Sequence, residues 1–61
     1  MQTIHDETAA RYPVLAHVNT SEGRFNFYTD SSSKYEIIPR LLEQVPAITW
    51  ADMHHAHVEI L

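Results

Sequence analysis

Residues 12–30 read YPVLAHVNTSEGRFNFYTD and contain two runs in which apolar and polar side chains alternate, the spacing of strands with one buried face. The apolar residues that share one face are Val14, Ala16 and Val18 in the first run and Phe25 and Phe27 in the second. Gly23 lies between the runs, where a tight reversal needs the positive φ that glycine adopts at little cost. The stretch therefore predicts a β-hairpin.

The segment after the hairpin is amphipathic and predicts a helix. Ser33 precedes Glu36 by three residues, the spacing of a capping box at a helix N-terminus. At about 100° per residue, the apolar side chains gather in one stripe, which comprises Tyr35, Ile37, Ile38, Leu41, Leu42 and Val45. Pro39 lies inside this segment, so the helix either continues through a kink or begins at the proline. We expect one kinked helix that ends before Pro46, because the stripe stays in phase across Pro39.

Alternation returns in residues 53–61 and predicts a third strand. Its two faces carry Ala56, Val58 and Ile60 on one side and His55, His57 and Glu59 on the other. A right-handed crossover through the helix places this strand beside the first one and antiparallel to it. We therefore expect an α+β domain over residues 12–61, a β-β-α-β fold whose three-stranded antiparallel sheet has the order 2-1-3 and one helix on one face. Residues 1–11 lack periodicity and are expected to form a flexible N-terminal segment.

Length and composition restrict the function. The chain has 61 residues, a formal net charge of −4 and no cysteine. A domain of this size buries too little surface to enclose a large substrate pocket, and a chain without cysteine has neither disulfides nor thiolate zinc sites. Its four basic residues are scattered, which disfavours nucleic acid as a partner, and no apolar stretch is long enough for a membrane span or a secretory leader. We expect a cytoplasmic protein whose function lies on its surface and involves neither nucleic acid nor a membrane.

The predicted topology leaves one face of the sheet uncovered by the helix. The side chains expected to form an interaction site on that face are Leu15, His17, Tyr28, His55 and His57. Apolar and aromatic groups on an open face, and edge strands without lysine, are typical of protein interfaces. We therefore expect a protein-binding module, with another protein or a second copy of the chain as its partner. Its size and acidity are similar to those of small phage and mobile-element proteins, an analogy that suggests a regulator or inhibitor.

The histidines of the same face allow an alternative function. His55 and His57 have the His-x-His spacing that places two imidazoles on one side of a strand, and His17 on the neighbouring strand would supply a third. Neutral imidazole is a ligand for zinc, nickel and copper. The alternative is therefore a histidine-based transition-metal site, although solvated surface histidines would give the same spacing. The protein-binding interpretation itself requires no cofactor.

The sequence offers little for catalysis. There is no cysteine nucleophile, the serines cluster where a helix cap explains them, and one glycine is too few for a phosphate-binding loop. We expect a protein that is not an enzyme.

Trp50 has two interpretations. As a large apolar residue it is expected to close the edge of the core together with Ile48. Alternatively, Trp50 forms a recognition loop with Asp52, Met53 and His54, since Trp and Met are common anchors at interfaces. We favour the core position.

Overall fold

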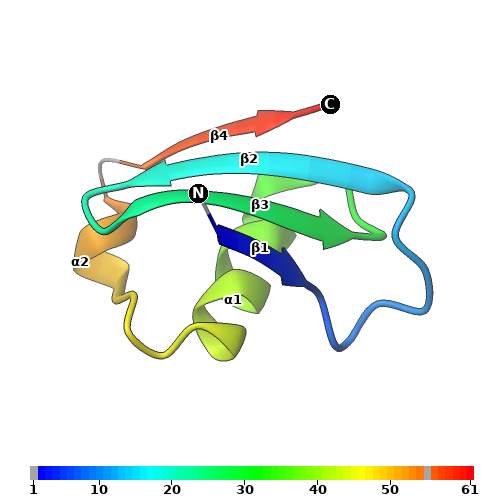
Figure 1. Ribbon diagram of the computed structural model, residues 1–61, viewed down its shortest axis with the longest axis horizontal. Coiled ribbons are helices and arrows are strands. Elements are labelled where there is room, and N and C mark those ends of the chain that lie inside the picture. The colour runs from blue at the N-terminus through cyan, green and yellow to red at the C-terminus, as the bar shows by residue number, and fades with distance from the viewer. Residues whose placement is uncertain (1, 55) are drawn as a thin grey trace.

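In the part of the chain that the structure describes, two helices lie against one face of a four-stranded sheet (Figure 1). The computed structural model describes residues 2–54 and 56–61. The elements, in chain order, are β1 (Gln2–His5), β2 (Val14–Thr20), β3 (Gly23–Thr29), α1 (Lys34–Gln44), α2 (Trp50–Met53) and β4 (His57–Ile60). The sheet has the order β1-β3-β2-β4, in which β2 is antiparallel to β3 and β4, whereas β1 is parallel to β3. The expected α+β class is confirmed.

Strands β2 and β3 form the expected hairpin. Thr20 and Gly23 are the last paired residues, so the turn between them contains only Ser21 and Glu22. Gly23 has a φ of 131°, a conformation that residues with a Cβ atom rarely adopt. The Thr20 side chain supports the turn, because its Oγ1 donates to the Gly23 carbonyl at 3.2 Å and accepts from the Glu22 N–H at 3.1 Å.

Helix α1 continues through Pro39, as the phase of the apolar stripe predicts. A proline at this position cannot donate to the Tyr35 carbonyl, but Tyr35 is 80% exposed and water can replace that donor. The expected capping box is not formed. Ser33 is the N-cap residue, but its side chain makes no capping hydrogen bond, and the Glu36 carboxylate lies 3.6 Å from Arg40 instead.

The sheet of the structure differs from the predicted three-stranded antiparallel sheet. The three predicted strands have the expected order, because β2 lies between β3 and β4, but β1 adds a fourth strand in parallel to β3. Residues 2–5, which the sequence assigns to a flexible segment, are the residues of this strand. The sheet is therefore mixed and has four strands rather than three antiparallel ones.

Beyond the expected elements, the structure has a second helix, α2; it ends at Met53, the first residue of the predicted third strand, and β4 begins only at His57. The cause is a capping box at Thr49. Its backbone N–H donates to Asp52 Oδ2 at 2.9 Å, and its Oγ1 accepts from the Asp52 N–H at 3.3 Å. These bonds satisfy backbone donors that an extended chain would leave to the solvent, and they favour a helical turn at this position.

The core lies between the sheet and the helices. Its buried apolar residues are Ala16, Val18, Phe25, Phe27, Ile37, Leu41, Ile48 and Met53. Ile48 is buried as expected, whereas Trp50 is 66% exposed, so its predicted core position is wrong. Met53, three residues further along α2, enters the core instead. Within residues 2–54 and 56–61, no helix combines the length and the apolarity that crossing a membrane requires.

Candidate functional site

The face of the sheet opposite the helices carries a row of apolar and aromatic side chains. His5 on β1 lies opposite Tyr28 on β3, and Tyr28 lies opposite Leu15 on β2. The row continues to Leu61, whose N–H donates to the Leu15 carbonyl at 2.9 Å. Residues that pair in this way point to the same side of a sheet, so the row crosses the full width of the sheet near one end.

The rings in this row contact one another. The His5 ring stacks on the Tyr28 ring, with centroids 5.1 Å apart and an interplanar angle of 12°. Tyr12, in the segment between β1 and β2, meets the His5 ring edge-on at 5.3 Å and 73°. Tyr12 is 45% exposed and Leu61 is 62% exposed. We call His5, Tyr12, Leu15, Tyr28 and Leu61 the aromatic row; it presents apolar surface to solvent.

Polar side chains lie beside the aromatic row on the same face. His17 on β2 is opposite Asn26 on β3 and opposite Glu59 on β4. His57 on β4 is opposite Asn19 on β2. An apolar strip bordered by polar groups is the usual composition of a protein interface, in which the rim remains hydrated and the centre is dry.

The residues that the sequence singles out for binding are thus largely brought together. Leu15, His17, Tyr28 and His57 share the open face, and Leu15 and Tyr28 are direct neighbours, whereas His55 lies outside the described residues. His5 and Tyr12 were missed because they fall in the segment predicted to be flexible. The signal that could have found them is the density of ring side chains in residues 5–12, since two such residues in a tail without a packing partner would be unusual.

The predicted metal ligands are only partly defined by the structure. His57 lies diagonally from His17, because the residue paired with His17 is Glu59, two positions further along β4. Diagonal neighbours in an antiparallel pair lie about 7–8 Å apart, a distance that two long side chains can close only by turning toward each other. Among residues 2–54 and 56–61, no group of three or more His, Cys, Asp or Glu side chains is arranged to hold a metal ion. With His55 outside these residues, the metal site stays a prediction.

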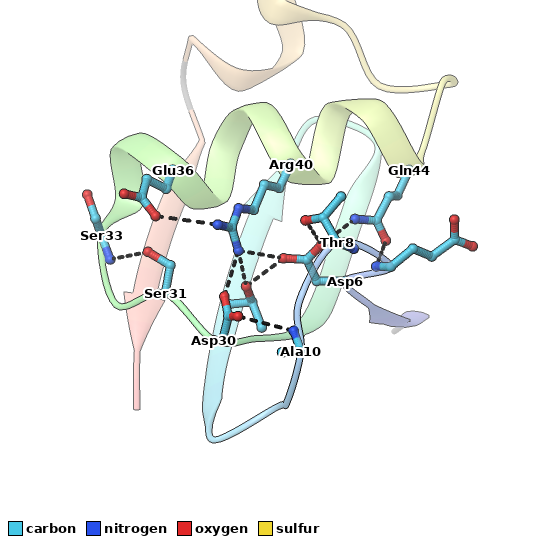
Figure 2. A network of polar contacts seen from close by, with 11 residues as sticks. Asp6, Thr8, Ala10, Asp30, Ser31, Ser33, Glu36, Arg40 and Gln44 are labelled. Atoms are coloured by element: carbon cyan, nitrogen blue, oxygen red, sulfur yellow. Dashed lines mark hydrogen bonds and ion pairs between the residues drawn. The ribbon is translucent and has the colours of Figure 1, made fainter.

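On the other side of the sheet, a buried carboxylate joins β1, β3 and α1 (Figure 2). Asp6 has no exposed surface, and both of its oxygens accept hydrogen bonds. Oδ1 accepts from the Thr8 N–H at 2.9 Å, from Thr8 Oγ1 at 2.6 Å and from Gln44 Nε2 at 2.7 Å. Oδ2 accepts from Thr29 Oγ1 at 2.7 Å and from Arg40 Nη1 at 3.0 Å.

Arg40 connects this carboxylate to a second one. Its Nη1 also donates to Asp30 Oδ1 at 2.7 Å, and Asp30 Oδ2 accepts from the Ala10 N–H at 3.2 Å. The network therefore fixes the chain after β1, the end of β3 and the middle of α1 relative to one another, as Figure 2 shows.

The donors around Asp6 determine its charge. Burial alone would raise the pKa of Asp6, but the hydrogen bonds from Thr8, Thr29 and Gln44 outweigh this effect and hold the pKa well below its usual range. The Arg40 guanidinium and the Ala10 N–H lower the pKa of Asp30 in the same way. Asp6 is thus an ionised group whose acceptor sites are occupied by protein donors. It has no proton to exchange near neutral pH and no free oxygen for a substrate, so we assign it a structural role.

A shallow depression of about 470 Å³ lies between α1 and α2. It is lined by Pro39, Leu42, Glu43, Ile48, Thr49 and Trp50. The exposed Trp50 indole borders this depression, which agrees better with the alternative interpretation of Trp50 as a surface residue than with the core position. Glu43 is the titratable side chain among the lining residues, and the Thr49 hydroxyl takes part in the capping box of α2.

Comparison with known protein families, with curated proteins and with solved structures finds no match to this chain.

Proposed function

We propose that this protein is a non-enzymatic binding module that recognises another protein through the open face of its sheet. The observation that supports the proposal is the aromatic row. It places two tyrosines, a histidine and two leucines in a continuous line that no other part of the described chain covers.

The chemistry of this face favours a protein partner over a small molecule. Tyrosine is enriched in the centres of protein interfaces, because its ring buries much apolar area at little conformational cost while its hydroxyl stays hydrogen-bonded. The depression of about 470 Å³, in which a small ligand could be partly buried, lies on the helical side and not on this face. The partner would offer an apolar surface to the aromatic row and polar groups to His17, Asn26 and Glu59. By occupying that surface the protein would act as a regulator or inhibitor of its target.

The test compares variants in affinity capture from the cells that express the protein. Tyr12→Ser and Tyr28→Ser remove ring area from the aromatic row, whereas Tyr35→Ser removes an equally large ring that is 80% exposed on α1. We expect a partner that is recovered with the wild type and with Tyr35→Ser and is lost with the other two variants. A partner retained by all three variants would contradict the use of the open face. Circular dichroism establishes that each variant is folded.

A second proposal is that the histidines of the same face bind a transition metal. It rests on the placement of His17 and His57 on neighbouring strands of the open face, with His55 as the third ligand that the sequence spacing suggests. A bound ion would lie beside the aromatic row, so metal binding and protein binding on this face are compatible. Titration with zinc, nickel and copper distinguishes the two proposals, because protein recognition by the aromatic row needs no ion.

A further inference from the structure

Strand β4 is one edge of the sheet, and its pairing with β2 determines which of its backbone groups face outward. The Leu61 N–H donates to the Leu15 carbonyl, and antiparallel ladders alternate between hydrogen-bonded and non-hydrogen-bonded pairs. His57, Glu59 and Leu61 therefore direct their N–H and C=O groups toward β2. Val58 and Ile60 direct theirs to the free edge, beyond which Figure 1 shows no further strand or helix.

Strand β4 is only four residues long, but its free edge lacks other features with which natural sheets prevent pairing with another strand. It contains no lysine, no proline and no bulge, and Ile60 is 38% exposed there. Its two charged or titratable side chains, His57 and Glu59, lie on the open face on either side of Val58. Such an arrangement is self-complementary under a two-fold rotation, which brings His57 of one copy to Glu59 of the other.

We propose that β4 pairs antiparallel with β4 of a second copy of this chain, in a register centred on Val58. Val58 and the partner's Val58 then exchange hydrogen bonds through the N–H and C=O groups that face the free edge. The Ile60 N–H donates to the partner's Ala56 carbonyl. The Ala56 N–H is already bonded to the Met53 carbonyl at 3.1 Å, so Ala56 contributes only its oxygen.

Charge favours this register over the two that are centred on His57 and on Glu59. Paired residues must point to the same side, so the centre of the dimer can shift only by whole residues along β4. Centred on His57, the pairing places two imidazoles opposite each other, and centred on Glu59 it places two carboxylates opposite each other, which is destabilising. Centred on Val58, it places His57 opposite the partner's Glu59 on both sides of the two-fold axis. These are non-hydrogen-bonded pairs, in which side chains approach most closely.

The dimer joins the two four-stranded sheets into one continuous sheet and leaves the aromatic row of each copy uncovered. The inference goes beyond the proposed function, because it uses the strand edge and not the open face. The proposed function and the proposed dimer can therefore be disproved independently of each other. Loss of a partner in Tyr28→Ser tests the open face, and loss of the dimer in β4 variants tests the edge.

The first experiment measures the dimer dissociation constant by sedimentation equilibrium for the wild type and for charge variants. His57→Glu places carboxylates opposite each other in the proposed register and should weaken the dimer about tenfold, since both symmetric pairs are affected. The double variant His57→Glu with Glu59→His exchanges the two groups and should restore the wild-type constant. A wild type that stays monomeric at high concentration, or a double variant as weak as the single one, would overturn the proposal.

The second experiment blocks each edge with proline. Ile60→Pro removes an N–H that faces outward, so it should abolish the dimer and leave the pairing of β4 with β2 intact. Thr3→Pro alters β1, the opposite edge of the sheet, where Thr3 is exposed, and should leave the dimer unchanged. If Thr3→Pro dissociates the dimer and Ile60→Pro does not, β1 is the interface and the proposal is wrong. Circular dichroism of both variants establishes that the monomer remains folded.

Discussion

Arg40 Nη1 lies 3.0 Å from Asp6 Oδ2, and this ion pair, with its carboxylate fully buried, joins the first strand to the first helix. The parallel strand β1 pairs only with β3 and contains four residues, so its backbone hydrogen bonds alone hold it weakly. The donors around Asp6 come from the chain after β1, from β3 and from α1. Their convergence on one carboxylate explains how a short segment of low apolarity stays attached to the sheet.

Replacing Asp6 should therefore destabilise the whole domain. Asp6→Ala leaves the Thr29 hydroxyl, the Gln44 amide and the Arg40 guanidinium without their shared acceptor in a buried site. We expect the free energy of unfolding to fall by about 3 kcal/mol, because the Thr29 and Gln44 donors lose a charged acceptor at a buried site, whereas Arg40 keeps its ion pair with Asp30. Urea denaturation measures the change, with Glu43→Ala on the exposed side of α1 as control. A loss no larger than that of the control would contradict the structural role of Asp6.

The contribution of Asp6 should disappear in acid. Its pKa in the folded protein lies below the unfolded value of about 3.9, so its stabilisation is fully present above that value and is lost as the pH falls toward the folded pKa. Asp30 and Asp52 shift in the same direction and contribute to the same trend. The test compares urea denaturation of the wild type and Asp6→Asn across the acidic range. The difference in stability between them should shrink as the pH decreases below about 4, and a constant difference would exclude the linkage.

Pro39 should be a site at which the protein can be stabilised. Pro39→Ala restores an N–H that can donate to the Tyr35 carbonyl within α1 and removes the clash of the ring with the preceding turn. The gain is offset in part because proline restricts the unfolded chain, so we expect a net increase of about 2 kcal/mol in the free energy of unfolding. Thermal denaturation should show a higher midpoint for Pro39→Ala. An unchanged or lower midpoint would mean that packing of the proline ring compensates for the missing hydrogen bond.

The two helix caps should respond differently to the same substitution. Thr49→Ala removes the Oγ1 that accepts from the Asp52 N–H and leaves the Thr49 N–H bond to Asp52 in place, so it removes one half of the capping box of α2, with an expected cost of about 1 kcal/mol. Ser33→Ala at the N-cap of α1 should cost much less, because the Ser33 side chain makes no capping hydrogen bond. Urea denaturation of each variant and of the wild type measures the two losses in the free energy of unfolding. Equal losses in the two variants would show that Ser33 caps α1 in solution.

The hairpin and α1 could be predicted from the sequence because their patterns are local. Alternation over residues 12–30 and the apolar stripe of α1 each describe a single element, and Gly23 marks the turn. Strand β1 could not be predicted in this way. Its residues show no alternation of apolar side chains, and its position depends on β3 and on Asp6, a residue type that is rarely buried without a partner. The pairing that buries Asp6 involves residues more than twenty positions away, which no local pattern records.

In the candidate site, too, residues on strands with a local pattern could be predicted from the sequence, and residues that depend on β1 could not. Leu15, Tyr28, His17 and His57 follow from strand alternation, which correctly assigns them to the open face. His5 and Tyr12 depend on β1 and could not be placed without it. Trp50 illustrates the opposite error, because its size favours burial, whereas the Thr49 capping box starts a helix that turns Met53 inward and leaves the indole exposed.

The metal proposal gives the last prediction. If the imidazoles of His17 and His57 bind an ion, together with His55 as the sequence spacing suggests, isothermal titration with zinc, nickel or copper at neutral pH should show binding close to one ion per chain. His17→Asn and His57→Asn should each weaken that binding at least tenfold, since each removes one of few ligands. His54→Asn, which replaces a histidine at the end of α2, serves as the control and should bind like the wild type.

Because His57 also lies in the proposed dimer contact, the titration is repeated with Ile60→Pro. Binding that persists there belongs to one chain, whereas binding lost in Ile60→Pro would mean that two chains share the ion. Absence of binding by the wild type to all three metals would exclude the site.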